Sequence, residues 1–259
     1  MLGHLDRGWA VASVDFRNSC EDSNAHPNPT QVLDIYTASI WLSQVLIPYL
    51  GEHDLDPDRF LLIGSSAGGH LAMLAGMLAN NSPWADHLPY IGVSSLYGVY
   101  DFVDPWLAET EVDAAGNVVP LWPENYRATA FLMGCPGDFW DSCSEWDKVF
   151  ASPTSWVDAD DPPVLMMHGR NDSFAAWSQA DLMWARLANQ RGAGTGTGRF
   201  RTNGTDTFIE LLSTQHLNNE TRQCEPNAND ELLPADHGCI SGDNAQAVNF
   251  LVWLSNMHG

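Results

Sequence analysis

Short apolar runs bounded by turn residues predict the strands of a buried sheet. One run extends from Phe60 to Gly64 and follows the turn-forming sequence of residues 56–59. A second run, residues 162–168, opens with two prolines and is followed by Gly169, and a third covers residues 207–212. Runs of this length with such boundaries are typical of buried strands. The continuously apolar segment from Leu71 to Leu78 predicts a helix after the first strand.

The first run leads directly into a G-x-S-x-G pattern, Gly64-Ser65-Ser66-Ala67-Gly68. The pattern alone arises by chance in many proteins, but here a strand precedes it and a helix follows it, which is the structural context that the motif requires. In that context the serine occupies a strained backbone position between strand and helix, and the glycines leave room for the crossing. We therefore predict Ser66 as a nucleophile at a helix N-terminus that stabilises a developing oxyanion.

A serine nucleophile needs a base and an orienting carboxylate. Asp172 lies on the loop after the second predicted strand, and His216 follows the third. Because α/β sheets carry their chemistry beyond the carboxyl ends of their strands, Ser66, Asp172 and His216 are all expected at that edge.

Other residues invite a catalytic role. His237 is the competing base, but it lies in a polar stretch far from a predicted strand end, so His216 is favoured. For His70 and His168 we expect structural roles, and for Asp101 a place in a turn.

Taken together, the chain resembles the α/β-hydrolase superfamily, specifically the esterase and lipase group with hormone-sensitive-lipase-like and feruloyl-esterase-like enzymes. The resemblance implies an α/β fold with a mostly parallel sheet and helices on both faces. It implies that Ser66 is the nucleophile, Asp172 the acid and His216 the base, and that the backbone N–H of Ala67 belongs to the oxyanion hole. Further matching segments are Gly8–Arg17 (a strand), 33–42 (a helix), Leu96–Asp101 (a strand), 152–153 and 177–179.

The chain departs from that family at its start. The family places an H-G-G-type loop, which donates a second oxyanion N–H, upstream of the strand that Gly8–Arg17 resembles, and the strand before that loop would sit between Gly8–Arg17 and Phe60–Gly64. The chain begins at Met1 and has no room for either. We expect it to be a fragment or a mis-started reading frame of a longer esterase, the alternative being that a partner or a rearranged sheet fills the gap.

Composition is consistent with a single domain over residues 1–259, because 44% of the residues are hydrophobic and no apolar run approaches the roughly 20 residues of a membrane span. The 33 acidic and 11 basic residues give a formal charge of −22, which argues against a nucleic-acid partner.

Residues 101–150 are long for a connection between core strands and are predicted to form a cap-like insertion. They are rich in tryptophan, including Trp140 and Trp146, which would form either an apolar substrate pocket or an ordinary core.

Cysteine usage favours an oxidising, extracytoplasmic compartment. Cys135 with Cys143, and Cys224 with Cys239, are possible disulfides that would leave Cys20 over, but the pairing cannot be read from sequence.

The sequence thus predicts a serine hydrolase that cleaves small-molecule carboxylic esters through an acyl-enzyme, with no cofactor and no metal. The alternatives are a non-catalytic binding protein of the same fold and a peptidase of the same fold.

Overall fold

The computed structural model describes the backbone of residues 9–19, 26–51, 55–83, 85–104, 110–112, 118–120, 123–135, 140–172, 174–192, 200–202, 207–210, 212–213, 215–217, 224–226 and 233–234. Side chains are described within these ranges up to residue 104, from 128 to 135 and from 140 to 192.

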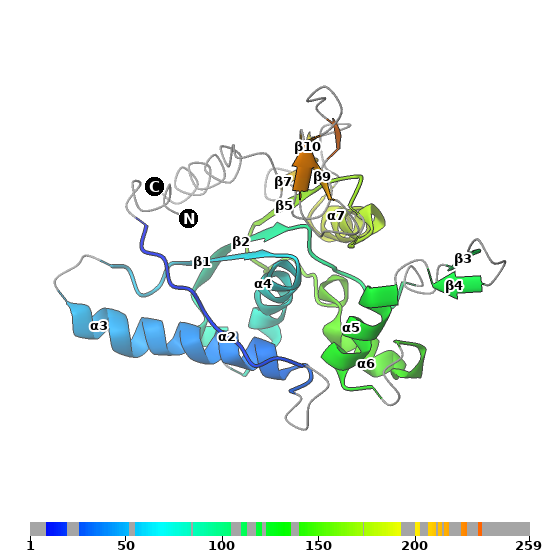
Figure 1. Cartoon of the computed structure of the whole chain (residues 1–259). Coiled ribbons are helices and arrows are strands. Elements are labelled where there is room, and N and C mark those ends of the chain that lie inside the picture. Colours follow the sequence, from blue (N-terminus) through cyan, green and yellow to red (C-terminus); the bar gives the residue numbers. More distant parts are fainter. Residues whose placement is uncertain are drawn as a thin grey trace.

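The centre of the molecule is a five-stranded sheet with the order β1-β2-β5-β7-β6 (Figure 1). Neighbours from β1 to β7 pair in parallel, and β6 is antiparallel to β7. All five residues of β5, the middle strand of the sheet, are buried. The five strands are β1 (Phe60–Ser65), β2 (Tyr90–Leu96), β5 (Val164–His168), β6 (Phe200–Thr202) and β7 (Thr207–Glu210).

Three helices pack against one face of this sheet: α2 (Thr30–Trp41), α4 (Ala67–Leu78) and α7 (Trp177–Arg191). Helix α4 lies between the other two (Figure 1). Its buried side chains accordingly belong to two core clusters, one shared with α2 and the other with α7. The predicted strands at 60–64, 162–168 and 207–212 and the predicted helices at 33–42 and 71–78 are confirmed, with small shifts of their ends.

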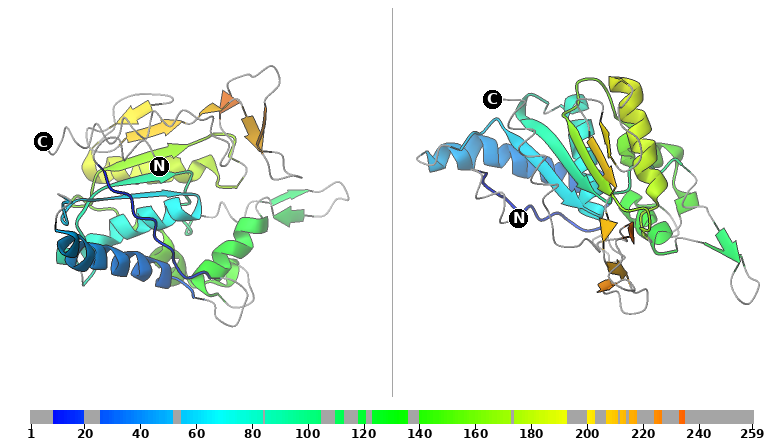
Figure 2. Two further views of the ribbon diagram at one scale, coloured as in Figure 1. Left: turned by 60° about the vertical axis from the view of Figure 1, so that its left-hand side comes forward. Right: turned by 90° about the horizontal axis from the view of Figure 1, so that it is seen from above.

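Helix α2 buries Val32, Ile35 and Tyr36 against α4, at a spacing that places them on one helical face. It continues through a π-helical turn, Leu42–Leu46, into α3 (Ile47–Leu50), and this long rod extends past the sheet (Figure 2). Trp41 and Tyr49 on this rod are exposed by 49% and 85%.

The prediction of a strand at Gly8–Arg17 is wrong, because residues 9–17 adopt no strand. Among the described strands β1 pairs with β2 alone, so it forms an edge of the sheet, and residues 9–17 do not pair with that edge. The segment is held by side chains instead: Phe16 packs against the α2–α4 cluster, and Arg17 forms an ion pair with Asp34 of α2. Among the described strands, the position expected for the missing strand lies at the open edge of β1.

The prediction of a strand at Leu96–Asp101 is also wrong. The strand is β2, which ends at Leu96, and the next residues leave the sheet at Tyr97, a non-glycine residue with a positive φ of 40°. The chain turns because Tyr100 and Asp101 donate their backbone N–H groups to Gln179 Oε1 of α7 instead of to a neighbouring strand. Asp101 is a turn residue as expected, since its Oδ1 accepts from Val103 N and Asp104 N.

The insertion between β2 and β5 carries a hairpin of β3 (Thr110–Val112) and β4 (Val118–Pro120), followed by helices α5 (Pro123–Met133) and α6 (Glu145–Ala151). A disulfide joins Cys135 to Cys143, one of the pairs that the sequence allows. Trp140 is buried and donates from Nε1 to Phe102 O, so it packs as core, whereas Trp146 is 65% exposed. The side chains of Cys20, Cys224 and Cys239 lie outside those that the structure describes.

Beyond β7 the chain forms short antiparallel pairs, β8 (Leu212–Ser213) with β11 (Leu233–Pro234) and β9 (Gln215–Leu217) with β10 (Cys224–Pro226). Figure 2 shows the β9–β10 pair beyond the carboxyl ends of the main strands.

None of the helices in the described ranges is long and apolar enough to cross a membrane. Short helical turns occupy Ala79–Asn81, Ala85–His87, Trp140–Ser142 and Pro153–Ser155.

Candidate active site

Ser66 occupies the turn between β1 and α4 with φ 53° and ψ −123°. A non-glycine residue adopts this region only when its surroundings enforce it, and such strain is concentrated at functional sites. The surroundings are visible: Ser66 N donates to Leu96 O of β2, and Ser66 O accepts from His70 N to begin the helix. The side chain of Ser66 does not cap α4, although serine at this position commonly does. The turn therefore fixes the backbone of Ser66 without using its hydroxyl to cap the helix.

Glycine is required at specific points around Ser66. A Cβ at Gly64 would lie 2.0 Å from Gly68 O, and a Cβ at Gly69 would lie 2.8 Å from Leu96 O. These two glycines let the first turn of α4 lie directly on β1 and β2. A Cβ at Gly68, by contrast, would meet nothing within 4 Å. The expectation that both glycines of the pattern prevent a clash therefore holds for Gly64 and is wrong for Gly68.

A cavity of about 270 Å³ opens beside this turn, and Ser66 and Ala67 form part of its wall. Ala67 is the first residue of α4, so its backbone N–H is one of the donors that a helix leaves without an intrahelical partner. The remaining wall comes from segments far apart in the sequence. Its other residues are Phe16, Asn18, Ser19, Gln31, His70, Leu71, Tyr97, Val99, Phe102, Ala128, Thr129, Leu132, Phe174 and Ala175.

Asp172 lies on the loop after β5, two strands from β1, and its side chain is buried. Its Oδ1 accepts from Phe174 N and Ala175 N, each at 2.8 Å, so the carboxylate shapes the loop that carries the cavity residues Phe174 and Ala175. Its Oδ2 lies 3.3 Å from His168 Nε2.

His168 ends β5 and is fully buried. Its Nε2 lies 2.9 Å from Ala175 O, and because a carbonyl only accepts, Nε2 carries the proton. His168 Nε2 thus contacts both the Asp172 carboxylate and Ala175 O in the loop that follows β5. This agrees with the structural role expected for His168.

His216 lies within β9, opposite Glu225 of β10, and not on an open loop after a strand. The end of β7 is Glu210, so a short β8 intervenes between the third predicted strand and this residue. The ring of His216 and the whole of His237 lie outside what the structure describes.

His70, in the second turn of α4, is buried, and its Nε2 donates to Ala151 O at 2.9 Å. Burial lowers the pKa of His70 to about 4, partly offset by the hydrogen bond to Ala151. The imidazole is therefore neutral near pH 7, and it packs edge-on against Phe102. This agrees with the structural role expected for His70, although the residue also borders the cavity.

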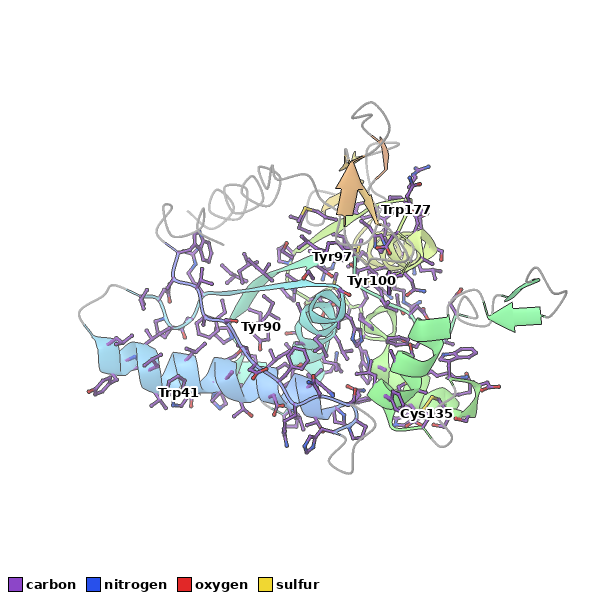
Figure 3. The ribbon with its side chains drawn as sticks, viewed as in Figure 1. Trp41, Tyr90, Tyr97, Tyr100, Cys135 and Trp177 are labelled. Atoms are coloured by element: carbon purple, nitrogen blue, oxygen red, sulfur yellow. A yellow bond between two sulfur atoms is a disulfide. The ribbon has the colours of Figure 1, made fainter. Side chains whose placement is uncertain are left out.

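Buried hydrogen bonds connect α4 to the segment after β2. Ser95 Oγ donates to Gly69 O and lies 2.9 Å from the hydroxyl of Tyr100, which also accepts from Gly98 N. Figure 3 shows Tyr97 and Tyr100 close together near the start of α4. Burial raises the pKa of Tyr100 to about 12, so its hydroxyl stays protonated. The start of α4 is thus fixed by groups that no sequence motif marks.

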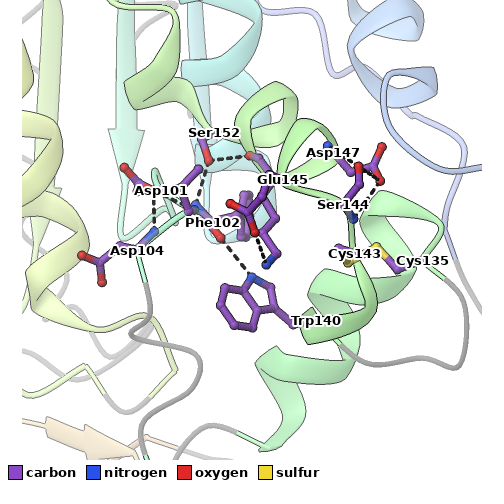
Figure 4. A network of polar contacts seen from close by, with 12 residues as sticks. Asp101, Phe102, Asp104, Cys135, Trp140, Cys143, Ser144, Glu145, Asp147 and Ser152 are labelled. Carbon is purple, nitrogen blue, oxygen red and sulfur yellow. Dashed lines mark hydrogen bonds and ion pairs between the residues drawn. A yellow bond between two sulfur atoms is a disulfide. The ribbon is translucent and has the colours of Figure 1, made fainter.

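A second network holds the insertion against the site (Figure 4). Ser152 Oγ accepts from Phe102 N and donates to Lys148 O, while Thr154 Oγ1 donates to Asp101 Oδ2. Phe102 is therefore held in the cavity wall at two points. Its backbone N–H is bound by Ser152, and its ring makes the edge-on contact with His70.

Sequence reasoning missed most of the cavity wall, including Phe16, Gln31, Thr129 and Phe174. These residues belong to no pattern, and only the folded chain brings them to Ser66.

A sequence model of the BD-FAE family matches residues 1–187. The chain belongs to the BD-FAE family. The match includes Ser66 and Asp172 and ends before His216 and His237.

Among curated proteins, this BD-FAE family member is similar to three from Mycobacterium tuberculosis. It is 27% identical over 189 residues to the probable carboxylic ester hydrolase LipM, 29% identical over 189 residues to esterase LipC and 26% identical over 198 residues to esterase LipQ. These alignments cover 70%, 70% and 74% of the chain but only 38%, 41% and 41% of the relatives. The chain thus spans about two fifths of their length.

Solved structures show the same fold. An esterase from Thermogutta terrifontis with bound butyrate superposes with a TM-score of 0.54 at 18% identity, covering 93% of this chain and 70% of that one. A bifunctional GH43-CE protein from Bacteroides eggerthii gives 0.57 at 16% identity, covering 92% and 28%. The BD-FAE chain has the α/β-hydrolase fold.

Proposed function

We propose that the protein hydrolyses carboxylic esters, with Ser66 as the nucleophile of an acyl-enzyme mechanism. The observation that carries the proposal is the strained backbone of Ser66 at the start of α4, at the wall of a cavity lined mostly by apolar side chains. The esterase names of the Mycobacterium tuberculosis relatives support the same reaction class.

In this mechanism His216 takes the proton of Ser66 Oγ as the oxygen attacks the ester carbonyl carbon. The Ala67 N–H donates to the resulting oxyanion, and the imidazolium returns the proton to the departing alcohol. Water then attacks the acyl carbon and loses a proton to His216, and the imidazolium returns that proton to Ser66 Oγ as the Oγ–C bond breaks and the carboxylic acid leaves. Asp172 holds the imidazole in the reactive tautomer.

The position of Asp172 supports its role as the acid. It lies beyond the carboxyl end of β5, at the same edge of the sheet as Ser66, and its loop continues into the cavity wall. Strand β9, which contains His216, lies beyond that same edge (Figure 2), which supports His216 as the base.

The insertion after β2 would act as a cap over the reacting ester. Its helix α5 contributes Ala128, Thr129 and Leu132 to the cavity wall, which supports this role. The buried packing of Trp140 indicates that this tryptophan stabilises the cap and does not contact the acyl group.

The nucleophile is tested by the hydrolysis of p-nitrophenyl butyrate. Ser66→Ala is expected to lower kcat by at least ~10³-fold, because triad residues act as a unit, while Tm stays unchanged. Ser65→Ala is the matched control, since Ser65 is an exposed neighbour at the end of β1. Equal loss in both variants, or none in either, would contradict the assignment, and a folded chain without turnover would favour a binding protein.

The base is tested by comparing His216→Ala with His237→Ala in the same assay. We expect a loss of ~10³-fold or more in kcat for His216→Ala alone, because only the catalytic base accepts the serine proton. A loss confined to His237→Ala would transfer the role to that residue and leave the Ser66 assignment intact.

A further inference from the structure

Within the described ranges, two non-glycine residues have a positive φ, Ser66 at 53° and Tyr97 at 40°. They lie side by side, because Ser65 and Leu96, the residues that precede them, are partners in the register of β1 and β2. Both also belong to the wall of the cavity. Bulky residues rarely adopt this backbone region, and such strain is concentrated at functional sites. The strain at Tyr97 therefore indicates a role at the same site as Ser66.

The surroundings of Tyr97 hold its backbone in this conformation. Tyr97 N donates to Met167 O of β5 at 2.7 Å, and the preceding Leu96 O accepts from Ser66 N. A glycine at position 97 would adopt the same φ without strain. The chain therefore carries a tyrosine here at a cost in stability, and a property of the side chain has to explain it.

The side chain of Tyr97 is not part of the buried core. Tyr97 is half-buried, whereas Gly98 and Tyr100, which follow it, are buried. None of the three core clusters formed by the described residues includes Tyr97, although Tyr36 and Tyr100 each belong to one. A partly accessible aromatic residue in a cavity wall offers apolar surface to a bound molecule.

The chemistry of the wall indicates which group of the ester this surface contacts. The wall residues that the structure describes include no carboxylate, lysine or arginine, so the cavity suits an uncharged group. In the acyl-enzyme proposed above, the acyl carbon is bonded to Ser66 Oγ and the alcohol has left. A wall residue beside Ser66 is therefore beside the acyl group throughout the second half of the reaction.

We propose that Tyr97 is a specificity-determining residue whose ring forms the wall against the acyl chain and limits its length. The proposal rests on the function proposed above and names the substrate class as esters of short, uncharged acyl groups. The cavity volume agrees with a short acyl group, because about 270 Å³ lies below the ~300–1,000 Å³ of common small-molecule pockets.

The experiment measures kcat/KM for p-nitrophenyl acetate, butyrate and hexanoate, which differ only in acyl length. A second series, methyl, propyl and pentyl butyrate, varies the alcohol alone. Tyr97→Gly removes the ring and suits the positive φ, Tyr97→Asn is a second truncation that tolerates this φ, and Tyr97→Phe keeps the ring. Tyr49→Gly is the matched control, since Tyr49 on α3 is exposed and is not a wall residue.

We expect the unsubstituted chain to prefer acetate or butyrate to hexanoate. Tyr97→Gly and Tyr97→Asn should each raise the ratio of kcat/KM for hexanoate to that for acetate by ~10-fold, because the wall opens. Tyr97→Phe and Tyr49→Gly should keep the ratio of the unsubstituted chain. A purely structural role of Tyr97 would lower all the rates together and leave this ratio unchanged.

Four results would overturn the proposal. They are a preference for hexanoate in the unsubstituted chain, an unchanged ratio in the truncated variants, a change confined to the alcohol series, and failure of both truncated variants to fold. The last would show that the side chain of Tyr97 serves stability.

Binding separates this inference from the proposed function. The Ser66→Ala chain is dialysed to equilibrium against p-nitrophenyl butyrate and p-nitrophenyl hexanoate, and the bound fractions give the ratio of the two dissociation constants. In Ser66→Ala/Tyr97→Gly this ratio should shift ~10-fold in favour of hexanoate, even if the unsubstituted chain shows no turnover. An unchanged ratio overturns the role of Tyr97 and leaves Ser66-dependent turnover as a separate result.

Discussion

At the residue scale, the candidate active site depends on Ser66, whose backbone conformation indicates a functional role as clearly as its hydroxyl does. The G-x-S-x-G pattern predicts Ser66 as the nucleophile, and the structure shows the positive φ that this role requires. Other residues of the cavity wall cannot be predicted from sequence patterns. Gln31 and Phe174 reach the cavity through helix packing and a loop turn, and neither has a neighbour in sequence that marks it.

His70 gives the folded protein a dependence on pH that can be measured. Burial lowers its pKa to about 4, below the value of 6.5 expected when the chain is unfolded, so the unfolded state binds more protons between these values. The free energy of unfolding should therefore fall as the pH is lowered from 6.5 towards 4, with this group contributing a slope of up to ~1.4 kcal/mol per pH unit.

Urea unfolding of His70→Gln over this pH range is the corresponding measurement. Glutamine keeps a donor for Ala151 O but does not titrate, so its slope should be smaller than that of the unsubstituted chain. The His87→Gln substitution, which removes an exposed imidazole, is the control. Identical slopes in all three proteins would show that His70 is not held neutral by folding.

At the element scale, predictions succeed where a pattern is local and fail where an element needs a neighbour. Strand β5 is predictable because its apolar run is bounded by Pro163 and Gly169. The segment at 9–17 carries a strand-like sequence, but no described strand pairs with it, and side-chain contacts with α2 and α4 hold it instead. Leu96–Asp101 fails because Gln179, distant in sequence, takes the N–H groups of Tyr100 and Asp101.

The contact between α4 and β1 predicts opposite outcomes for two glycines of one motif. Gly64→Ala places a Cβ 2.0 Å from Gly68 O, so the helix must shift, and the free energy of unfolding should fall by ~3 kcal/mol or more with loss of esterase activity. Gly68→Ala meets no atom within 4 Å and replaces a helical glycine, so it should raise stability by ~0.5 kcal/mol. Urea unfolding of both variants tests this. A larger destabilisation from Gly68→Ala would contradict the packing of α4 described above.

At the scale of the whole molecule, the α/β-hydrolase fold is predictable because the G-x-S-x-G turn after β1 and the strand before Asp172 occur in the expected order. The shape of the cavity is not predictable, since its wall joins the segment before α2, helix α5 and the loops after β2 and β5. The disulfide between Cys135 and Cys143 and the hydrogen bonds of Ser152 stabilise the insertion that completes this wall.

Covalent trapping would show directly whether Ser66 is an activated nucleophile. The chain is incubated with a fluorophosphonate, which phosphonylates activated serines and releases fluoride, and the modified peptide is identified by mass spectrometry. We predict a single adduct on Ser66, prevented by Ser66→Ala and retained in Ser65→Ala. An adduct on another residue, or a folded chain that takes up no label, would contradict the account.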